Sequence, residues 1–164
     1  MNKLTVWRVP ILFLLLAALF WGQAALVRAQ GSNVAVLEFD GPVTPIMHTY
    51  FERGLAEAAQ SGADAVLIIL DTPGGAVVTT LEIVELFRAS EIPVIVYIGP
   101  EGAIAASAGS IITAAAHAAG MAPETIIGAA SPINSDGSDI NETAYRKEVE
   151  ALKATMRSLA ERRG

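Results

Sequence analysis

The sequence predicts an α/β domain with a largely parallel sheet. Residues 65–70 (AVLIIL) and 93–98 (PVIVYI) are unbroken apolar runs, which are typical of strands buried on both faces of such a sheet. Segments with helical spacing separate these runs from each other and from further strand-like segments. Alternating strands and helices indicate parallel strands joined by crossover helices.

The first half of the domain is predicted to hold two strands and two helices. The expected strands are residues 33–39 and 65–70, and the expected helices are residues 45–60 and 78–87. The first helix ends at Ser61-Gly62, because glycine commonly terminates helices. Its apolar side is predicted to contain Ile46, Tyr50, Leu55 and Ala58.

The second half begins with the strand at residues 93–98. Residues 105–119 are small and apolar and are expected to form one buried helix, followed by a short strand at 125–127 and a polar loop at 131–140. Residues 141–163 are predicted to form a charged helix. Its apolar stripe consists of Tyr145, Val149, Leu152, Met156 and Leu159.

Residues 1–29 have the features of a targeting segment. Lys3 and Arg8 supply a positive start, and residues 9–26 are mostly apolar. The segment ends with Ala29, after which a signal peptidase is expected to cut. The alternative is an uncleaved signal anchor, because residues 9–27 are nearly long enough to cross a bilayer. In both cases residues 30–164 are expected to form an exported domain.

Charge and composition exclude several functions. Residues 30–164 hold 8 Lys and Arg against 17 Asp and Glu, so this part of the chain is strongly acidic. Such a surface argues against nucleic-acid binding, which needs basic patches to meet phosphate. The chain has no cysteine, which excludes disulfides, thiolate metal sites and a thiol nucleophile.

Two loops are predicted to meet at one edge of the sheet. Asp71 to Gly75 (DTPGG) follows the strand that ends at Leu70, and a small-residue loop containing Ser107 follows the strand that ends at Ile98. Sites in parallel α/β sheets lie beyond the carboxyl ends of the strands. A shared site is therefore expected if both strands belong to the same sheet.

Ser107 is the candidate nucleophile of this site. It lies near the start of a helix-like run among small neighbours that let a substrate backbone approach, while Gly74 and Gly75 can turn N–H groups toward an oxyanion. The alternatives are a capping or buried hydroxyl at Ser107 and an ordinary Pro-Gly turn at the glycines. Asp71 either orients a neighbour or caps the following turn.

The base that would serve Ser107 is not a histidine. His117 is expected on the same helix about 15 Å away at 1.5 Å per residue, and His48 lies on the first helix. A lysine can act as base when burial lowers its pKa. The lysines that follow Ser107 are Lys147 and Lys153, which point to different sides of one helix, and periodicity does not choose between them.

Three blocks, DTPGG, PVIVYIGPEGAIAASAGSII and AGMAPETIIGAASPI, resemble the membrane-bound serine proteases of the NfeD family, which act with stomatin-like proteins. The resemblance covers residues 33–164. It implies a ClpP/crotonase-like spiral of ββα units over residues 30–164. It also implies that the domain is C-terminally truncated here, because the family's protease domain continues beyond the last helix.

The resemblance assigns roles to five residues. It makes Ser107 the nucleophile, and counting back from Ser158-Leu159-Ala160 selects Lys147 as the base. Gly74 and Gly75, with the N–H of Ala108, would form the oxyanion hole. The ClpP histidine has no counterpart in the GAASPIN segment, which agrees with a Ser-Lys dyad.

The expected function is therefore a membrane-associated or exported Ser-Lys endopeptidase, with its protease domain outside the cytoplasm. The resemblance implies cleavage of apolar polypeptide segments, such as those of a stomatin-like partner, and a homodimer. Neither a metal nor an organic cofactor is needed for this chemistry. An uncleaved N-terminal segment would attach the protein to the membrane.

Three alternatives remain open from the sequence. A signal-peptide-peptidase-like protease shares the fold and the dyad but differs in substrate. A crotonase-type acyl-CoA enzyme would use the oxyanion loop without needing Ser107. A non-catalytic, truncated partner would bind a stomatin-like protein without cutting it.

Overall fold

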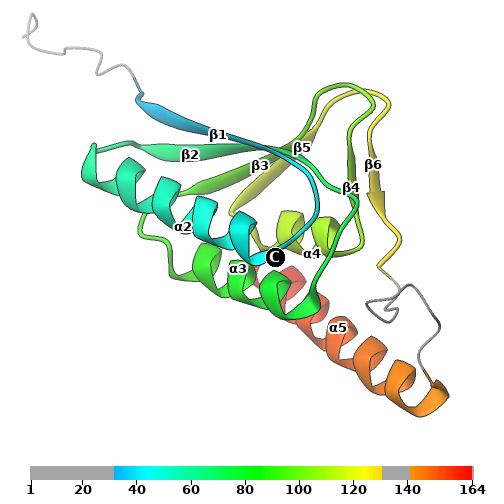
Figure 1. The fold of residues 1–164 in the computed structure, drawn as a ribbon. Coiled ribbons are helices and arrows are strands. Elements are labelled where there is room, and N and C mark those ends of the chain that lie inside the picture. Colours follow the sequence, from blue (N-terminus) through cyan, green and yellow to red (C-terminus); the bar gives the residue numbers. More distant parts are fainter. Residues whose placement is uncertain (1–31, 131–140, 164) are drawn as a thin grey trace, which may run out of the picture. The chain divides into compact units, whose positions relative to one another are not determined.

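The computed structural model describes residues 32–130 and 141–163 (Figure 1). The predicted targeting segment and the predicted polar loop at residues 131–140 lie outside the described residues. Within the described part, no helix has both the length and the hydropathy that a bilayer-spanning segment requires.

The main sheet of the described residues has four parallel strands in the order β1-β2-β3-β5. These are β1 (Val34–Asp40), β2 (Ala65–Asp71), β3 (Val94–Ile98) and β5 (Ala118–Met121). In the register, Leu70 of β2 pairs with Ile98 of β3, so the carboxyl ends of the two central strands lie side by side. The predicted parallel α/β architecture is confirmed.

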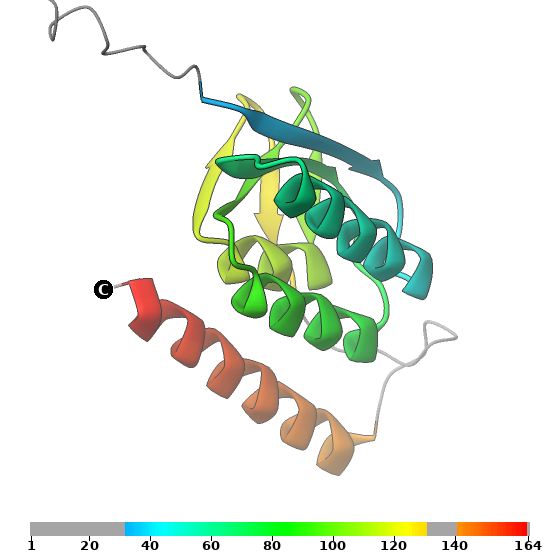
Figure 2. The same ribbon diagram turned by 90° about the vertical axis from the view of Figure 1, so that its left-hand side faces the viewer.

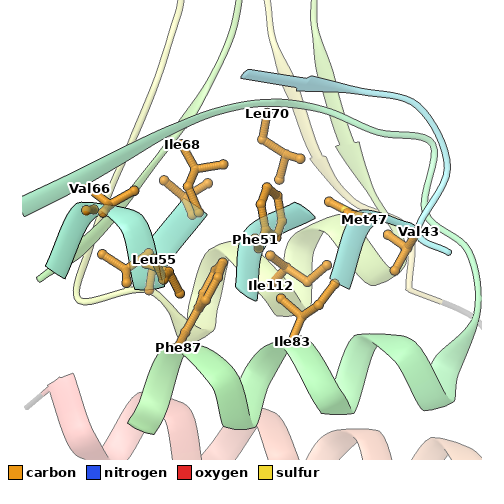
Figure 3. Packing of buried hydrophobic residues seen from close by; sticks show 14 of the residues in the cluster. Val43, Met47, Phe51, Leu55, Val66, Ile68, Leu70, Ile83, Phe87 and Ile112 are labelled. Carbon is orange, nitrogen blue, oxygen red and sulfur yellow. The ribbon is translucent and has the colours of Figure 1, made fainter. Parts of the chain in front are cut away.

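Helices α2 (Pro45–Gln60), α3 (Val77–Ala89) and α4 (Ala108–Ala115) cover one face of this sheet (Figures 1 and 2). The core forms between the sheet and these helices, where Phe51 of α2 packs near Phe87 of α3, with ring centroids 5.8 Å apart (Figure 3). The largest fully buried side chains include Met47, Phe51, Ile68, Leu70, Ile83, Phe87 and Ile112.

The expectation that the central strands are buried on both faces is wrong. In β2, Val66, Ile68 and Leu70 are fully buried, whereas the residues between them are only half-buried. The helices of the described residues lie on one face alone, so the opposite face keeps part of its exposure.

The predicted apolar side of α2 was half wrong. Leu55 and Ala58 are buried as expected, but Ile46 is 77% exposed and Tyr50 is 38% exposed. Met47 and Phe51 take the core positions instead, because they lie four residues apart and in line with Leu55 on the same side of the helix.

The single helix expected at residues 105–119 is also wrong. The segment contains β4 (Ile104–Ala106), the helix α4 and the start of β5. β4 pairs in parallel with β6 (Ile126–Gly128) in a separate two-stranded sheet, and β5 pairs with β3. Alanine favours helices, but pairing with neighbouring strands overrides this preference at both ends of the segment.

The charged helix is present as α5 (Glu142–Arg163) and runs beside the helix layer (Figure 2). It contacts α4 and forms a small apolar cluster, separate from the main core, in which Leu159 packs with Val84 of α3 and Ile111 of α4. Of its predicted stripe, Leu159 is buried, while Tyr145 and Met156 are each 38% exposed.

Candidate active site

The loop after β2 is joined directly to β4, the strand that leads to Ser107. Thr72 donates its N–H to the Ile104 carbonyl at 2.7 Å and accepts from the Ala106 N–H at 3.0 Å. The Asp71 carboxylate accepts the Ile104 N–H at 2.9 Å. The predicted meeting of the two loops is therefore present, and Asp71 serves it by holding β4 in place.

Ser107 has a strained backbone. It lies between β4 and α4 with φ 52° and ψ −116°, values that L residues rarely adopt. Its N–H donates to the Gly128 carbonyl at 2.6 Å, and its carbonyl accepts the Ser110 hydroxyl at 2.6 Å. Such conformations cost on the order of 1–3 kcal/mol, persist only when surrounding bonds hold them, and concentrate at functional sites.

The side chain of Ser107 is available for chemistry. The residue is half-buried, and among the described residues its hydroxyl makes no hydrogen bond and does not cap α4. The bonds that hold Ser107 use its main chain alone. The capping role considered for this hydroxyl is therefore wrong.

Gly74 lies directly against Ser107. A Cβ on Gly74 would be 2.7 Å from the Ser107 Cβ and 2.9 Å from the Ala106 carbonyl oxygen. The residue also has φ +101°, which favours glycine. Any side chain here would push the loop away from the serine.

Gly75 and Ala108, the other two predicted oxyanion donors, have N–H groups without a partner among the described residues. The Gly74 carbonyl accepts the Val43 N–H at 2.9 Å, and the Gly74–Gly75 peptide bond is trans, so the Gly75 N–H points away from Val43. Ala108 is the first residue of α4, where N–H groups lack helical partners and the helix dipole favours negative charge. The role of Gly75 and Ala108 as oxyanion donors stays a prediction.

Gly74, the third predicted oxyanion donor, already uses its N–H in a hydrogen bond. Its N–H donates to the Thr72 hydroxyl at 3.2 Å in a buried position. Thr72 was missed by the sequence argument, because a threonine inside a Pro-Gly turn carries no pattern that distinguishes it.

A small hollow opens beside Ser107. Its free volume is about 20 Å³, which is room for about one water molecule. The lining residues are Gly75, Val77, Thr80, Ser107, Ala108, Ile111, Ala130 and Leu152. The walls are mostly apolar, and α5 contributes Leu152, which was assigned to the apolar stripe but not to the site.

Lys147 does not line this hollow. It lies near the start of α5, is exposed, and forms no ion pair with another described residue. Lys153 is also exposed and contacts Glu150 at 2.8 Å. The hydrogen bond from Lys153, together with its charge, lowers the pKa of the Glu150 carboxyl.

The histidines do not belong to the site. His117 was expected on the helix of Ser107, but α4 ends at Ala115 and His117 lies between α4 and β5. There its Nδ1 accepts the Val94 N–H at 3.1 Å, which ties the start of β5 to β3. His48 is half-buried on α2. Within the described residues, no three His, Asp or Glu side chains gather as a metal site would require.

Comparison with known proteins gives a family and two relatives. The family described as NfeD1b, N-terminal domain, matches residues 33–164. Membrane-bound protease PH1510 of Pyrococcus horikoshii is 44% identical over 100 residues, covering 61% of this chain and 23% of that protein. Membrane protein NfeD1b of Bacillus subtilis is 30% identical over 117 residues, covering 71% and 26%. The chain thus spans about a quarter of the length of these relatives.

Solved structures of related membrane-bound proteases are also similar to this chain. A serine-to-alanine variant of the 1510-N membrane-bound stomatin-specific protease has a TM-score of 0.73 at 38% identity, covering 79% of this chain and 63% of that one. A lysine-to-alanine variant in complex with a substrate peptide also has a TM-score of 0.73, at 36% identity, covering 80% and 61%. The ClpP protease catalytic domain from Plasmodium falciparum has a TM-score of 0.58 at 17% identity, covering 76% and 65%, which shows a shared fold alone. The expected ClpP-like fold is confirmed.

Proposed function

Because the chain belongs to the family of the NfeD1b N-terminal domain, we propose that it is a membrane-associated serine endopeptidase with a Ser107–Lys147 dyad. One observation carries the proposal. Ser107 has a strained backbone and a hydroxyl without a hydrogen bond to any described residue, and Gly75 and Ala108 line the same hollow. A nucleophile beside paired backbone donors is the arrangement that acyl transfer requires.

In the proposed reaction, the neutral amine of Lys147 takes the proton from the Ser107 Oγ as the oxygen attacks a peptide carbonyl carbon. The N–H groups of Gly75 and Ala108 donate to the resulting oxyanion. Collapse of the tetrahedral intermediate breaks the C–N bond, and the Lys147 ammonium gives its proton to the leaving amine. Water activated by Lys147 then hydrolyses the ester and restores the Ser107 hydroxyl.

The choice of Lys147 over Lys153 has two supports. The substituted serine and lysine in the two 1510-N variants are 41 positions apart in that protein, and Ser107 and Lys147 are 40 apart. Lys153 is already engaged by Glu150. The proposal requires Lys147 to move to Ser107 when substrate binds, since it is exposed in this structure.

The proposed substrate is an apolar polypeptide segment, such as part of a stomatin-like membrane protein. The hollow beside Ser107 is lined by Val77, Ile111 and Leu152, which favours small apolar side chains. The 1510-N relative is described as stomatin-specific. We also propose that residues 1–29 are a signal peptide or anchor, that residues 30–164 lie outside the cytoplasm, and that the protein forms a homodimer.

A second candidate is a non-catalytic partner that binds such a segment without cutting it. The observation that favours it is the exposure of Lys147 outside the hollow. It predicts the same preference for apolar segments but no turnover.

The test is cleavage of an apolar fluorogenic peptide by the full chain and by Ser107→Ala, Lys147→Ala and Lys153→Ala. We expect loss of cleavage for the first two variants by at least about a thousandfold, while Lys153→Ala, an exposed lysine on the same helix, remains close to wild type. Activity that survives Lys147→Ala but disappears in Lys153→Ala would reverse the choice of base. Peptide binding without cleavage by the wild-type chain would favour the non-catalytic partner.

A further inference from the structure

Thr72 is a polar residue at the junction of the site and is completely buried. Its main chain makes two of the hydrogen bonds that join the loop after β2 to β4, and the Asp71 carboxylate accepts a third. A buried hydroxyl needs a partner. The partner of Thr72 is the N–H of Gly74, 3.2 Å from its Oγ1.

This hydrogen bond holds Gly74, the residue whose carbonyl shares a peptide unit with the proposed donor, the Gly75 N–H. Gly74 is held at its N–H by Thr72 and at its carbonyl by the Val43 N–H, 2.9 Å away. The Gly75 N–H belongs to the same peptide unit as that carbonyl and points the opposite way. Both glycines have positive φ, at +101° and +159°, so the loop relies on external bonds to stay in one conformation.

The methyl group of Thr72 contacts Gly109, the residue after Ala108, which carries the other proposed donor. A Cβ on Gly109 would lie 2.6 Å from the Thr72 Cγ2, so the first turn of α4 packs closely against this methyl group. That turn begins with Ala108, whose N–H is the second donor. One side chain therefore contacts the glycine loop through its hydroxyl and the start of α4 through its methyl.

From these contacts we infer that Thr72 is a positioning residue that sets the N–H groups of Gly75 and Ala108 relative to Ser107. The inference rests on the proposed function and adds a residue to it. Thr72 does not touch the reacting atoms. It acts by holding two donors where the oxyanion forms, and donors so placed act mainly on the transition state.

Two substitutions separate the parts of the side chain. Thr72→Val keeps the shape and removes the hydroxyl, and Thr72→Ser keeps the hydroxyl and removes the methyl. For peptide cleavage by the full chain, we expect Thr72→Val to lower kcat about 10- to 100-fold with KM within about twofold. Thr72→Ser is expected to recover most of the kcat that Thr72→Val loses.

Thr113→Val is the matched control. Thr113 is also buried, and its hydroxyl donates to the Gly109 carbonyl at 2.7 Å inside α4. This variant removes a buried threonine hydroxyl without touching the glycine loop. We expect its kcat to stay within about threefold of wild type, because the Gly109 carbonyl that accepts its hydroxyl is neither of the proposed donors.

Hydrogen exchange at the Gly74 amide, measured by NMR, tests the loop without reference to catalysis. We expect exchange at least about tenfold faster in Thr72→Val than in wild type, with little change in Thr72→Ser and Thr113→Val. Unchanged kcat and unchanged Gly74 exchange in a folded Thr72→Val protein would overturn the inference. If the wild-type chain does not cleave peptides, the proposed function fails, and the exchange rate alone decides whether Thr72 holds the loop.

Discussion

Gly74 and Ser107 lie so close that a Cβ on the glycine would be 2.7 Å from the Cβ of the serine. Through this contact, the turn after β2 packs against Ser107, the residue that precedes α4. Because Gly75 follows in the same loop and Ala108 follows Ser107, this one approach places both proposed donors beside the hydroxyl. The site depends on the absence of a side chain at position 74.

Gly74→Ala is predicted to damage both stability and activity. The new methyl would clash with Ser107 and the Ala106 carbonyl, and the backbone would keep an unfavourable φ. We expect a loss of about 1–3 kcal/mol in the free energy of unfolding, measured by urea denaturation. Peptide cleavage is expected to fall by about 100-fold or more, because loop and serine must separate.

Gly62→Ala serves as the control for this substitution. Gly62 also has positive φ, at +71°, but nothing lies within 4 Å of the position its Cβ would take. We expect a similar backbone cost without the loss of cleavage that Gly74→Ala shows. Equal losses of cleavage in the two variants, at equal stability, would mean that the contact with Ser107 is unimportant.

Leu152→Ala is predicted to widen the hollow. Leu152 of α5 forms one wall of a space with a free volume of about 20 Å³. Two peptides are compared, one with a bulky apolar residue before the cut and one with alanine there. We expect the ratio of their kcat/KM values, bulky over alanine, to rise about tenfold. Met156→Ala is the control, because Met156 lies on the same helix and lines a groove whose lining residues do not include Ser107. A ratio that does not change in Leu152→Ala would place the substrate side chain elsewhere.

Leu159→Ala is predicted to loosen α5 rather than the whole domain. Leu159 is 4% exposed and packs with Val84 and Ile111 in a cluster separate from the main core. We expect α5 to lose about 2 kcal/mol of local stability. Amide exchange should therefore quicken in α5 and stay slow in β2 and β3. Exchange that quickens equally in β2 would show that α5 and the core unfold together.

The sequence predicted the central strands and most helices from apolar patterns, because long buried runs leave a strong signal. It also predicted that the loops of Gly74 and Ser107 would meet. The reason was incomplete, since Ser107 follows β4, which pairs with β6 and Thr72 rather than continuing from β3. β4 has three residues, too few for a periodic pattern, and its alanines favour a helix when taken alone.

Roles that depend on tertiary contacts were beyond the sequence argument. The sequence predicts that the N–H of Gly74 is available for an oxyanion, and only the position of the Thr72 hydroxyl shows that this N–H is already bonded. Leu152 was predicted as part of an apolar stripe, but its place at the hollow depends on how α5 packs on α4. Periodicity left Lys147 and Lys153 equivalent, and the two differ here in that Lys153 pairs with Glu150.

The dyad is tested most directly by covalent labelling. The full chain and the Lys147→Ala and Lys153→Ala variants are treated with a fluorophosphonate, and the adduct is located by mass spectrometry of digested protein. We predict one adduct, on Ser107, at similar rates in wild type and Lys153→Ala and at least about 100-fold more slowly in Lys147→Ala. An adduct on another residue, or labelling of Ser107 at an unchanged rate in Lys147→Ala, would contradict a Ser107–Lys147 dyad.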